Sequence, residues 1–143
     1  MIGVVVITHG SLASGLESAV SLLAGKPDKF AIAELHPGDT PGDFKSRVET
    51  AVASVDDGEG VLALVDIFGG TPSNTISQLF DRDDVRAVAG TNLPMVIQAL
   101  FMRESVGIEE LPSQVLEAGN EALVDIRQKF VEALQSQDDE EDF

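Results

Sequence analysis

Four short apolar runs alternate with segments of helical spacing along this chain, and this alternation limits the fold more than any other feature. The runs lie within residues 2–10 and at residues 30–35, 61–65 and 85–89, and each is followed within four residues by a glycine. Strands buried on both faces of a parallel sheet read as continuous apolar runs of this kind. The sequence therefore predicts an α/β domain, a doubly wound open sheet of four parallel strands with helices on both faces.

The segments between the runs carry apolar residues three or four positions apart, as one face of a helix does. In the first helix this face is predicted to hold Leu12, Leu16, Ala19, Val20 and Leu23. A second helix is predicted at residues 41–55, and a third begins at Pro72 with Thr71 as its cap.

The segment 94–102 is apolar nearly all round, so a helix there is expected to be buried on two sides. We expect a subunit interface to be the second cover, with a merely well-buried helix as the alternative. Residues 112–134 are predicted to be mostly helical, with an interruption at Gly119 and a short strand at 122–126 as an alternative.

Composition narrows the classes of function. A chain of 143 residues suits one domain, and the absence of cysteine excludes disulfides, thiolate nucleophiles and cysteine-ligated metals. The net charge of −16 repels nucleic acids and anionic membranes but attracts basic proteins. The apolar N-terminal run is too short to span a membrane and lacks the flanks of a secretory signal, so we expect a soluble, unprocessed, cytoplasmic protein.

The C-terminus is strongly acidic. Residues 138–142 are five consecutive acidic residues. We divide the chain into a domain at residues 1–134 and an acidic tail at residues 135–143, and we expect the tail to be solvated and disordered.

Two polar residues stand at the ends of predicted strands. His9 follows the first apolar run and Asp66 follows the third, and open α/β sheets place their sites at the carboxyl ends of their strands. A carboxylate that accepts a hydrogen bond from one imidazole N–H fixes the tautomer and leaves the lone pair of the other nitrogen free. His9 is therefore a candidate nucleophile toward a phosphoryl group, and Asp66 is the candidate group that orients it and stabilises its developing charge.

Glycines and small polar residues follow both strand ends, where helices are predicted to begin. Free backbone N–H groups at a helix N-terminus favour anions, and the lack of a side chain on glycine permits close approach. The expected phosphate-binding residues are Gly10, Ser11, Gly69, Gly70 and Thr71.

Other chemistries lack their sequence signatures. The chain has no G-x-S-x-G, no G-x-x-x-x-G-K-[ST] and no G-x-G-x-x-G motif. A metal site made of His9, His36 and Asp66 has no H-x-x-H or H-E-x-x-H spacing to support it, so we expect no metal and no cofactor. His36 is interpreted as an exposed loop histidine.

Three motifs in this order resemble a known family. They are I-T-H-G at residues 7–10, L-V-D-I-F-G-G-T-P at 64–72 and G-T-N-L-P-M at 90–95. Across about residues 1–130 the chain resembles the IIA domain of the mannose (mannose/fructose/sorbose) family of the bacterial phosphoenolpyruvate:sugar phosphotransferase system (PTS).

The resemblance implies a phosphotransferase component. The carrier protein HPr would phosphorylate His9, at Nε2, and His9 would pass the group to a histidine of a IIB component that serves membrane IIC and IID proteins. Asp66 would orient the ring, and Thr71 and the Gly69-Gly70 amides would contact the phosphate. Because this chain ends in an acidic tail, we expect IIB to be a separate polypeptide.

The resemblance also implies the strand order 2-1-3-4 and a homodimer whose subunits exchange a short antiparallel fifth strand, here near residues 122–126.

The phosphotransferase subunit of dihydroxyacetone kinases shares the fold, but it commonly has a serine where this chain has Gly10, and it lacks the D-x-x-G-G-[ST]-P turn. Two rivals remain: a regulatory module whose partner affinity changes on phosphorylation, and a non-catalytic ligand-binding domain. The transported sugar cannot be read from the chain.

Overall fold

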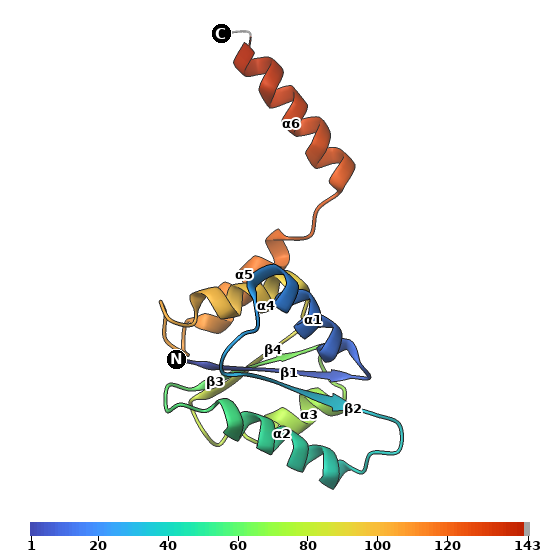
Figure 1. Cartoon of the computed structure of the whole chain (residues 1–143), viewed down its shortest axis with the longest axis vertical. Coiled ribbons are helices and arrows are strands. Elements are labelled where there is room, and N and C mark those ends of the chain that lie inside the picture. The colour runs from blue at the N-terminus through green and yellow to red at the C-terminus, as the bar shows by residue number, and fades with distance from the viewer. Residues whose placement is uncertain (142–143) are drawn as a thin grey trace.

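The computed structural model describes residues 1–141 and contains one four-stranded parallel sheet. The strands are β1 (Gly3–His9), β2 (Phe30–Leu35), β3 (Val61–Val65) and β4 (Val85–Ala89). Their order is β2-β1-β3-β4, so the predicted strands and their order 2-1-3-4 are confirmed (Figure 1).

The register of the sheet brings two strand ends together. β1 lies between β2 and β3, with Ile7 opposite Val65 and His9 opposite Leu35. Because all the strands are parallel, the residues that follow β1 and β3 emerge at the same edge. His9 and Asp66 are therefore neighbours in space although they lie 57 positions apart in the sequence.

Helices cover both faces of the sheet (Figure 1). On one face lie α1 (Leu12–Ala24), α4 (Leu93–Met102) and α5 (Leu111–Glu121), and on the other lie α2 (Pro41–Val55) and α3 (Thr71–Ser77). Side chains alternate across a strand, so Val4 and Val6 of β1 enter the core under α1 and α4, whereas Val5 and Ile7 enter the core under α2. The prediction of helices on both faces is confirmed.

The buried face of α1 differs from the predicted one. Ala13, Leu16 and Val20 are buried, whereas Leu12 and Leu23 are 47% and 64% exposed. The rotation follows from the cap: the buried Thr8 hydroxyl oxygen accepts a hydrogen bond from the Ala13 amide at 3.0 Å. Thr8 thus takes the capping role and directs Ala13 toward the sheet.

The second cover of α4 is α5 of the same chain. Met95 of α4 packs directly over Gly119, where a Cβ would lie 2.6 Å from Met95 Cγ, and Asn92 Nδ2 donates to the Gly119 carbonyl at 3.2 Å. Gly119 therefore permits close helix packing. The predicted interruption of the helix at Gly119 is wrong, because α5 continues through this residue. The structure holds one chain, and Phe101 of α4 is 66% exposed, so the expected subunit interface against α4 stays a prediction.

Arg103, which follows α4, joins three segments at the amino edge of the sheet. The residue is only 6% exposed, and its guanidinium donates to the carbonyls of Ile2, Asp28 and Lys29 at 3.4, 2.6 and 3.1 Å. Burial lowers the pKa of this guanidinium. Arg103 thereby fixes the starts of β1 and β2 against α4.

The C-terminal segment forms a long helix, α6 (Ile126–Glu141), which projects away from the sheet and the other helices (Figure 1). The prediction of a disordered tail is therefore wrong for residues 135–141, while residues 142 and 143 lie outside the described part. Within the single chain, residues 123–125 have no regular structure and Ala122 lies in a turn, so the alternative strand at 122–126 is not formed.

Candidate active site

One carboxylate oxygen holds His9 by two hydrogen bonds. Asp66 Oδ2 accepts from the backbone amide of His9 at 2.9 Å and lies 2.8 Å from the ring nitrogen Nδ1. The other oxygen, Oδ1, accepts from the Ile67 amide at 2.9 Å. The two side chains differ in exposure: 44% of His9 is accessible but only 10% of Asp66. The carboxylate is therefore fixed and mostly covered, and the imidazole reaches solvent.

The hydrogen bonds set the protonation state of Asp66. Burial raises the pKa of its carboxyl, but the hydrogen bonds from the His9 amide, the His9 ring and the Ile67 amide outweigh burial and hold this pKa below its usual value. An ionised carboxylate only accepts hydrogen bonds, so Nδ1 carries the proton of the neutral ring. The lone pair of the neutral imidazole then lies on Nε2.

Gly70 lies against the edge of the imidazole that carries Nε2. A Cβ at this position would be 2.9 Å from His9 Cε1 and 3.3 Å from His9 Nε2. The backbone of Gly70 is extended, with φ −89° and ψ −179°, so its conformation does not require glycine. The absence of a side chain is needed instead to leave room beside Nε2.

The turn before α3, which contains Gly70, has backbone amides without hydrogen-bond partners. Within residues 1–141, the amides of Gly69, Gly70 and Thr71 donate no hydrogen bond, and the Thr71 hydroxyl has no partner. The prediction that Thr71 caps α3 is wrong, because α3 begins at Thr71 and Gly70 is the capping residue. The Thr71 hydroxyl is thus free for another acceptor.

The loop after β1 contributes less than the sequence predicts. The Gly10 amide donates to the Leu35 carbonyl at 2.8 Å, so it is not a free donor, and the role of Gly10 is its left-handed turn with φ +56°. Ser11 is exposed, and its side chain does not cap α1. Ser11 therefore remains a candidate donor, and Gly10 does not.

His36 lies in the loop after β2 and is exposed, as predicted. Its amide donates to Asp39 Oδ2 at 2.7 Å, and its Nε2 is 3.8 Å from Glu34 Oε1. In turn, Glu34 Oε2 accepts from the Ser14 amide of α1 at 2.9 Å. These contacts connect the loop to α1 without bringing His36 into contact with Asp66.

The chain matches the family described as the PTS system fructose IIA component over residues 3–116. This range contains both His9 and Asp66 and every strand of the sheet. The chain belongs to this family.

Individual IIA relatives agree with this assignment. The chain is 30% identical over 133 residues to the PTS system mannose-specific EIIAB component of Escherichia coli (strain K12), covering 92% of this chain but only 41% of that protein. It is 28% identical to the PTS system fructose-specific EIIA component of Bacillus subtilis (strain 168), over 78% of this chain and 77% of the relative.

The fold agrees with a solved IIA structure. The phosphotransferase system component EIIA from Streptococcus agalactiae superposes with a TM-score of 0.82 at 26% identity, covering 90% of this chain and 99% of that one. The sheet order predicted from the resemblance is thus that of a IIA component.

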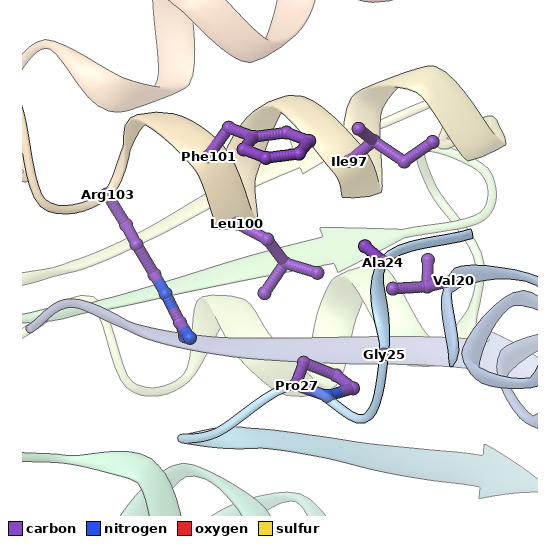
Figure 2. A pocket seen from close by; sticks show the side chains of 8 residues that line it. All are labelled: Val20, Ala24, Gly25, Pro27, Ile97, Leu100, Phe101 and Arg103. Atoms are coloured by element: carbon purple, nitrogen blue, oxygen red, sulfur yellow. The ribbon is translucent and has the colours of Figure 1, made fainter. Parts of the chain in front are cut away.

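A cavity of about 180 Å³ lies between α4 and the C-terminal end of α1 with the loop that follows it. Figure 2 shows Ile97, Leu100 and Phe101 of α4 facing Val20, Ala24 and Pro27, with Arg103 at one end. None of the predicted site residues lines this cavity.

Within residues 1–141, no helix combines the length and hydropathy of a membrane span, and no cluster of three or more His, Asp or Glu side chains is arranged to hold a metal ion.

Proposed function

We propose that this IIA chain is a phosphoryl carrier of a sugar phosphotransferase system. His9 accepts a phosphoryl group from phospho-HPr and passes it to a histidine of a IIB component, for uptake and phosphorylation of a sugar. The observation that carries the proposal is the pair of hydrogen bonds from His9 to Asp66 Oδ2, which leaves an exposed Nε2 lone pair. The proposal places the protein in the cytoplasm with HPr.

The transfer needs no proton removal from the nucleophile. The Nε2 lone pair forms the new N–P bond, the N–P bond to the donor histidine breaks, and the donor ring keeps the electron pair. The His9 ring becomes positively charged, and the adjacent Asp66 carboxylate stabilises that charge. Transfer to IIB runs through the same steps in reverse, with His9 as the leaving group.

Preformed donors would hold the transferred group. Gly70 lies beside His9 Nε2, and the amides of Gly69, Gly70 and Thr71 and the Thr71 hydroxyl have no hydrogen-bond partner among the described residues. Ser11 follows His9 by two positions in the sequence. Such donors stabilise the charge on the equatorial phosphoryl oxygens without reorganisation during the reaction. We therefore assign phosphate binding to these four residues.

Homodimer formation by strand exchange is part of the proposal. Leu123, Val124 and Ile126 are 74%, 49% and 81% exposed, although they are large and apolar. β4 is an edge strand, and beside it lies a groove of about 540 Å³ lined in part by Phe80, Val85 and Leu116. The groove lining is mixed, since it also includes Arg82, Arg86 and Glu109. An unpaired strand edge beside such a groove is a site where an extended segment of a second chain adds a strand.

Delivery of the phosphoryl group tests this function. We expect phosphorylated chain, once separated from HPr, to transfer its label to a IIB component and to support sugar phosphorylation in reconstituted membranes that contain the IIC and IID proteins. A regulatory module would accept the label from HPr but retain it when mixed with IIB. Retention of the label with every IIB component encoded by the same organism would contradict the carrier role.

A further inference from the structure

The cavity between α4 and the C-terminal end of α1 is bounded by apolar side chains and by one buried cation. Val20, Ile97 and Leu100 line its walls, and Arg103 lies at one end (Figure 2). Its volume of about 180 Å³ suits a small organic molecule, since an apolar cavity of about 150 Å³ holds benzene. Phe101 also lines it and is 66% exposed, so a ligand can enter from the surface.

The guanidinium of Arg103 has a donor left over. Its two terminal nitrogens donate to the carbonyls of Ile2, Asp28 and Lys29, whereas Nε donates to none of them. No fully buried polar side-chain atom of residues 1–141 lacks a hydrogen-bond partner, so Nε is not sealed within the protein. Because Arg103 lines the cavity, Nε can donate to an acceptor bound there.

Arg103 also lacks a counter-charge. The residue is only 6% exposed, its three acceptors are neutral carbonyls, and no carboxylate of the described residues forms an ion pair with it. A buried charge without an opposite charge is costly. An anion in the cavity would therefore supply what the chain itself does not.

The other charges at this end of the cavity nearly cancel. Lys26 and Lys29 equal Asp28 and Glu104 in number, and all of these except the half-buried Lys29 are exposed, so water screens them. The C-terminal turns of α1 and α4 add partial negative charges, which are also weaker than a full charge. The buried guanidinium of Arg103 is the least screened group, and it therefore determines which ligand charge is favoured.

The loop at residues 25–29 is held in a strained conformation beside Arg103. Lys29 is the only residue other than glycine with a positive φ in the described part of the chain, at +46°. Its amide donates to Asp28 Oδ1 at 3.0 Å, and its carbonyl accepts from Arg103 and from the Val4 amide, each at 3.1 Å. Strained backbone that several hydrogen bonds maintain is typical of ligand sites. The loop thus forms this end of the cavity before any ligand binds.

We propose that the cavity binds a small organic acid, with an apolar body of about six carbon atoms between α1 and α4 and a carboxylate that accepts from Arg103 Nε. A charged acceptor suits a charged donor, because such hydrogen bonds are stronger than neutral ones. Inorganic phosphate does not fit, since a dianion needs more donors than Nε provides and gains nothing from apolar walls. The inference does not rest on the proposed function, because none of the predicted site residues lines the cavity.

Hexanoate is the probe, and methyl NMR of the full chain in its native oligomeric state is the measurement. We expect saturable shifts of the Val20, Ile97 and Leu100 methyl signals, with a Kd of about 1 mM for a ligand of about eight non-hydrogen atoms. Val48 and Val52, which lie under α2 on the opposite face of the sheet, should not shift. No saturable shift at about ten times this concentration would contradict the inference, including when a second subunit covers the cavity.

The role of Arg103 is tested with ligands, because substitution of this residue would also release the starts of β1 and β2. Hexan-1-ol has the same chain length without the charge, hexylammonium has the opposite charge, and acetate has no apolar body. We expect hexan-1-ol to bind at least about tenfold more weakly than hexanoate, and the other two to give no saturable shift. Equal affinity for hexanoate and hexan-1-ol, or binding of hexylammonium, would exclude a carboxylate contact with Arg103.

Two substitutions that fill the cavity test the position of the ligand. Leu100→Trp and Ala24→Phe enlarge side chains on its two walls and should each weaken hexanoate binding by about tenfold or more, since interiors leave no room for both groups. Leu22→Trp is the matched control, because Leu22 is 88% exposed and does not line the cavity. Circular dichroism checks the fold of each variant. Wild-type affinity in both filled variants would place the ligand elsewhere and contradict the inference.

His9→Ala separates this inference from the proposed function. The variant should bind hexanoate with the wild-type Kd, because His9 lies at the other end of β1 from the Ile2 carbonyl that Arg103 contacts. Loss of hexanoate binding in a folded His9→Ala chain would contradict a separate site. A wild-type chain that binds hexanoate but is not phosphorylated would contradict the proposed function alone.

Discussion

Asp66 Oδ2 accepts hydrogen bonds from both the amide and the Nδ1–H of His9, at 2.9 and 2.8 Å. A single carboxylate oxygen therefore fixes both the backbone at the end of β1 and the orientation of the His9 imidazole. The Ile67 amide holds the second oxygen, so the carboxylate cannot rotate without losing a hydrogen bond. The geometry links the fold of the two strand ends directly to the reactivity of Nε2.

Replacement of Asp66 by Asn tests this link. We expect Asp66→Asn to slow transfer from phospho-HPr roughly ten- to hundredfold, because a charge-assisted hydrogen bond to the charged ring contributes about 1.5–3 kcal/mol. Stopped-flow or quenched-flow phosphorylation measures the rate, and circular dichroism checks the fold. Wild-type kinetics in a folded variant would remove Asp66 from the mechanism.

Gly70→Ala tests the space beside the ring. The added Cβ would meet His9 Cε1 at 2.9 Å and displace the imidazole, while the extended backbone accepts alanine without strain. We expect phosphorylation to slow by about tenfold or more, since small displacements of reacting groups are costly. Unfolding by urea should show a stability change below about 1 kcal/mol.

Gly15→Ala is the control for this substitution. Gly15 lies inside α1, and no atom comes within 4 Å of the position of its Cβ. Alanine there should raise the free energy of unfolding by about 0.5–1 kcal/mol and leave phosphorylation unchanged. Equal kinetics in Gly70→Ala and Gly15→Ala would contradict the role given to Gly70.

The ion pairs of Arg82 predict a pH dependence of stability. Hydrogen bonds from the Arg82 guanidinium hold the pKa of Asp56 and of Asp84 below the usual value near 3.8. A carboxyl whose pKa is lower in the folded state stabilises the fold above its unfolded pKa, and this stabilisation is lost as the pH falls through the folded pKa. Acidification below about pH 4 should therefore lower the free energy of unfolding.

Arg82→Met should raise both carboxyl pKa values, measured by carbon-detected NMR titration, and should reduce the change in stability between pH 7 and pH 3. Arg86→Met is the control, because Arg86 Nε donates to the Asp83 carbonyl rather than to Asp56 or Asp84. Unchanged pKa values in Arg82→Met would show that the ion pairs do not persist in solution.

Leu123→Glu tests the proposed exchange of residues 122–126. A charge within the exchanged strand should prevent it from packing beside β4, so we expect the dimer to dissociate into folded monomers in analytical ultracentrifugation. Leu22→Glu is the control, since Leu22 is 88% exposed on α1. A Leu123→Glu chain that remains dimeric would place the subunit interface elsewhere.

Local patterns were sufficient to predict the sheet. The runs at 30–35, 61–65 and 85–89 coincide with β2, β3 and β4, because a strand buried on both faces admits few polar residues. The strand order came from the family resemblance, since periodicity in one chain does not say which strands pair. The contact of His9 with Asp66 follows once that order is known.

Features that depend on tertiary contacts were predicted less well. Gly119 suggested a break in the helix, but its role is to admit Met95, a contact between residues 24 positions apart. The Gly10 amide was expected to be free, but β2 provides an acceptor for it at Leu35. Arg103 was not singled out, because a lone arginine after a helix has no sequence pattern that reveals its burial.

The most direct test of the proposed phosphoryl carrier role is the position of the phosphate. After incubation with phosphoenolpyruvate, enzyme I and HPr, we expect one acid-labile phosphate per chain, located at His9 Nε2 by NMR. His36→Ala, which removes the other histidine in the sequence, should be labelled normally, and His9→Ala should not be labelled. Label that persists in His9→Ala, or that disappears in His36→Ala, would contradict the assignment of His9.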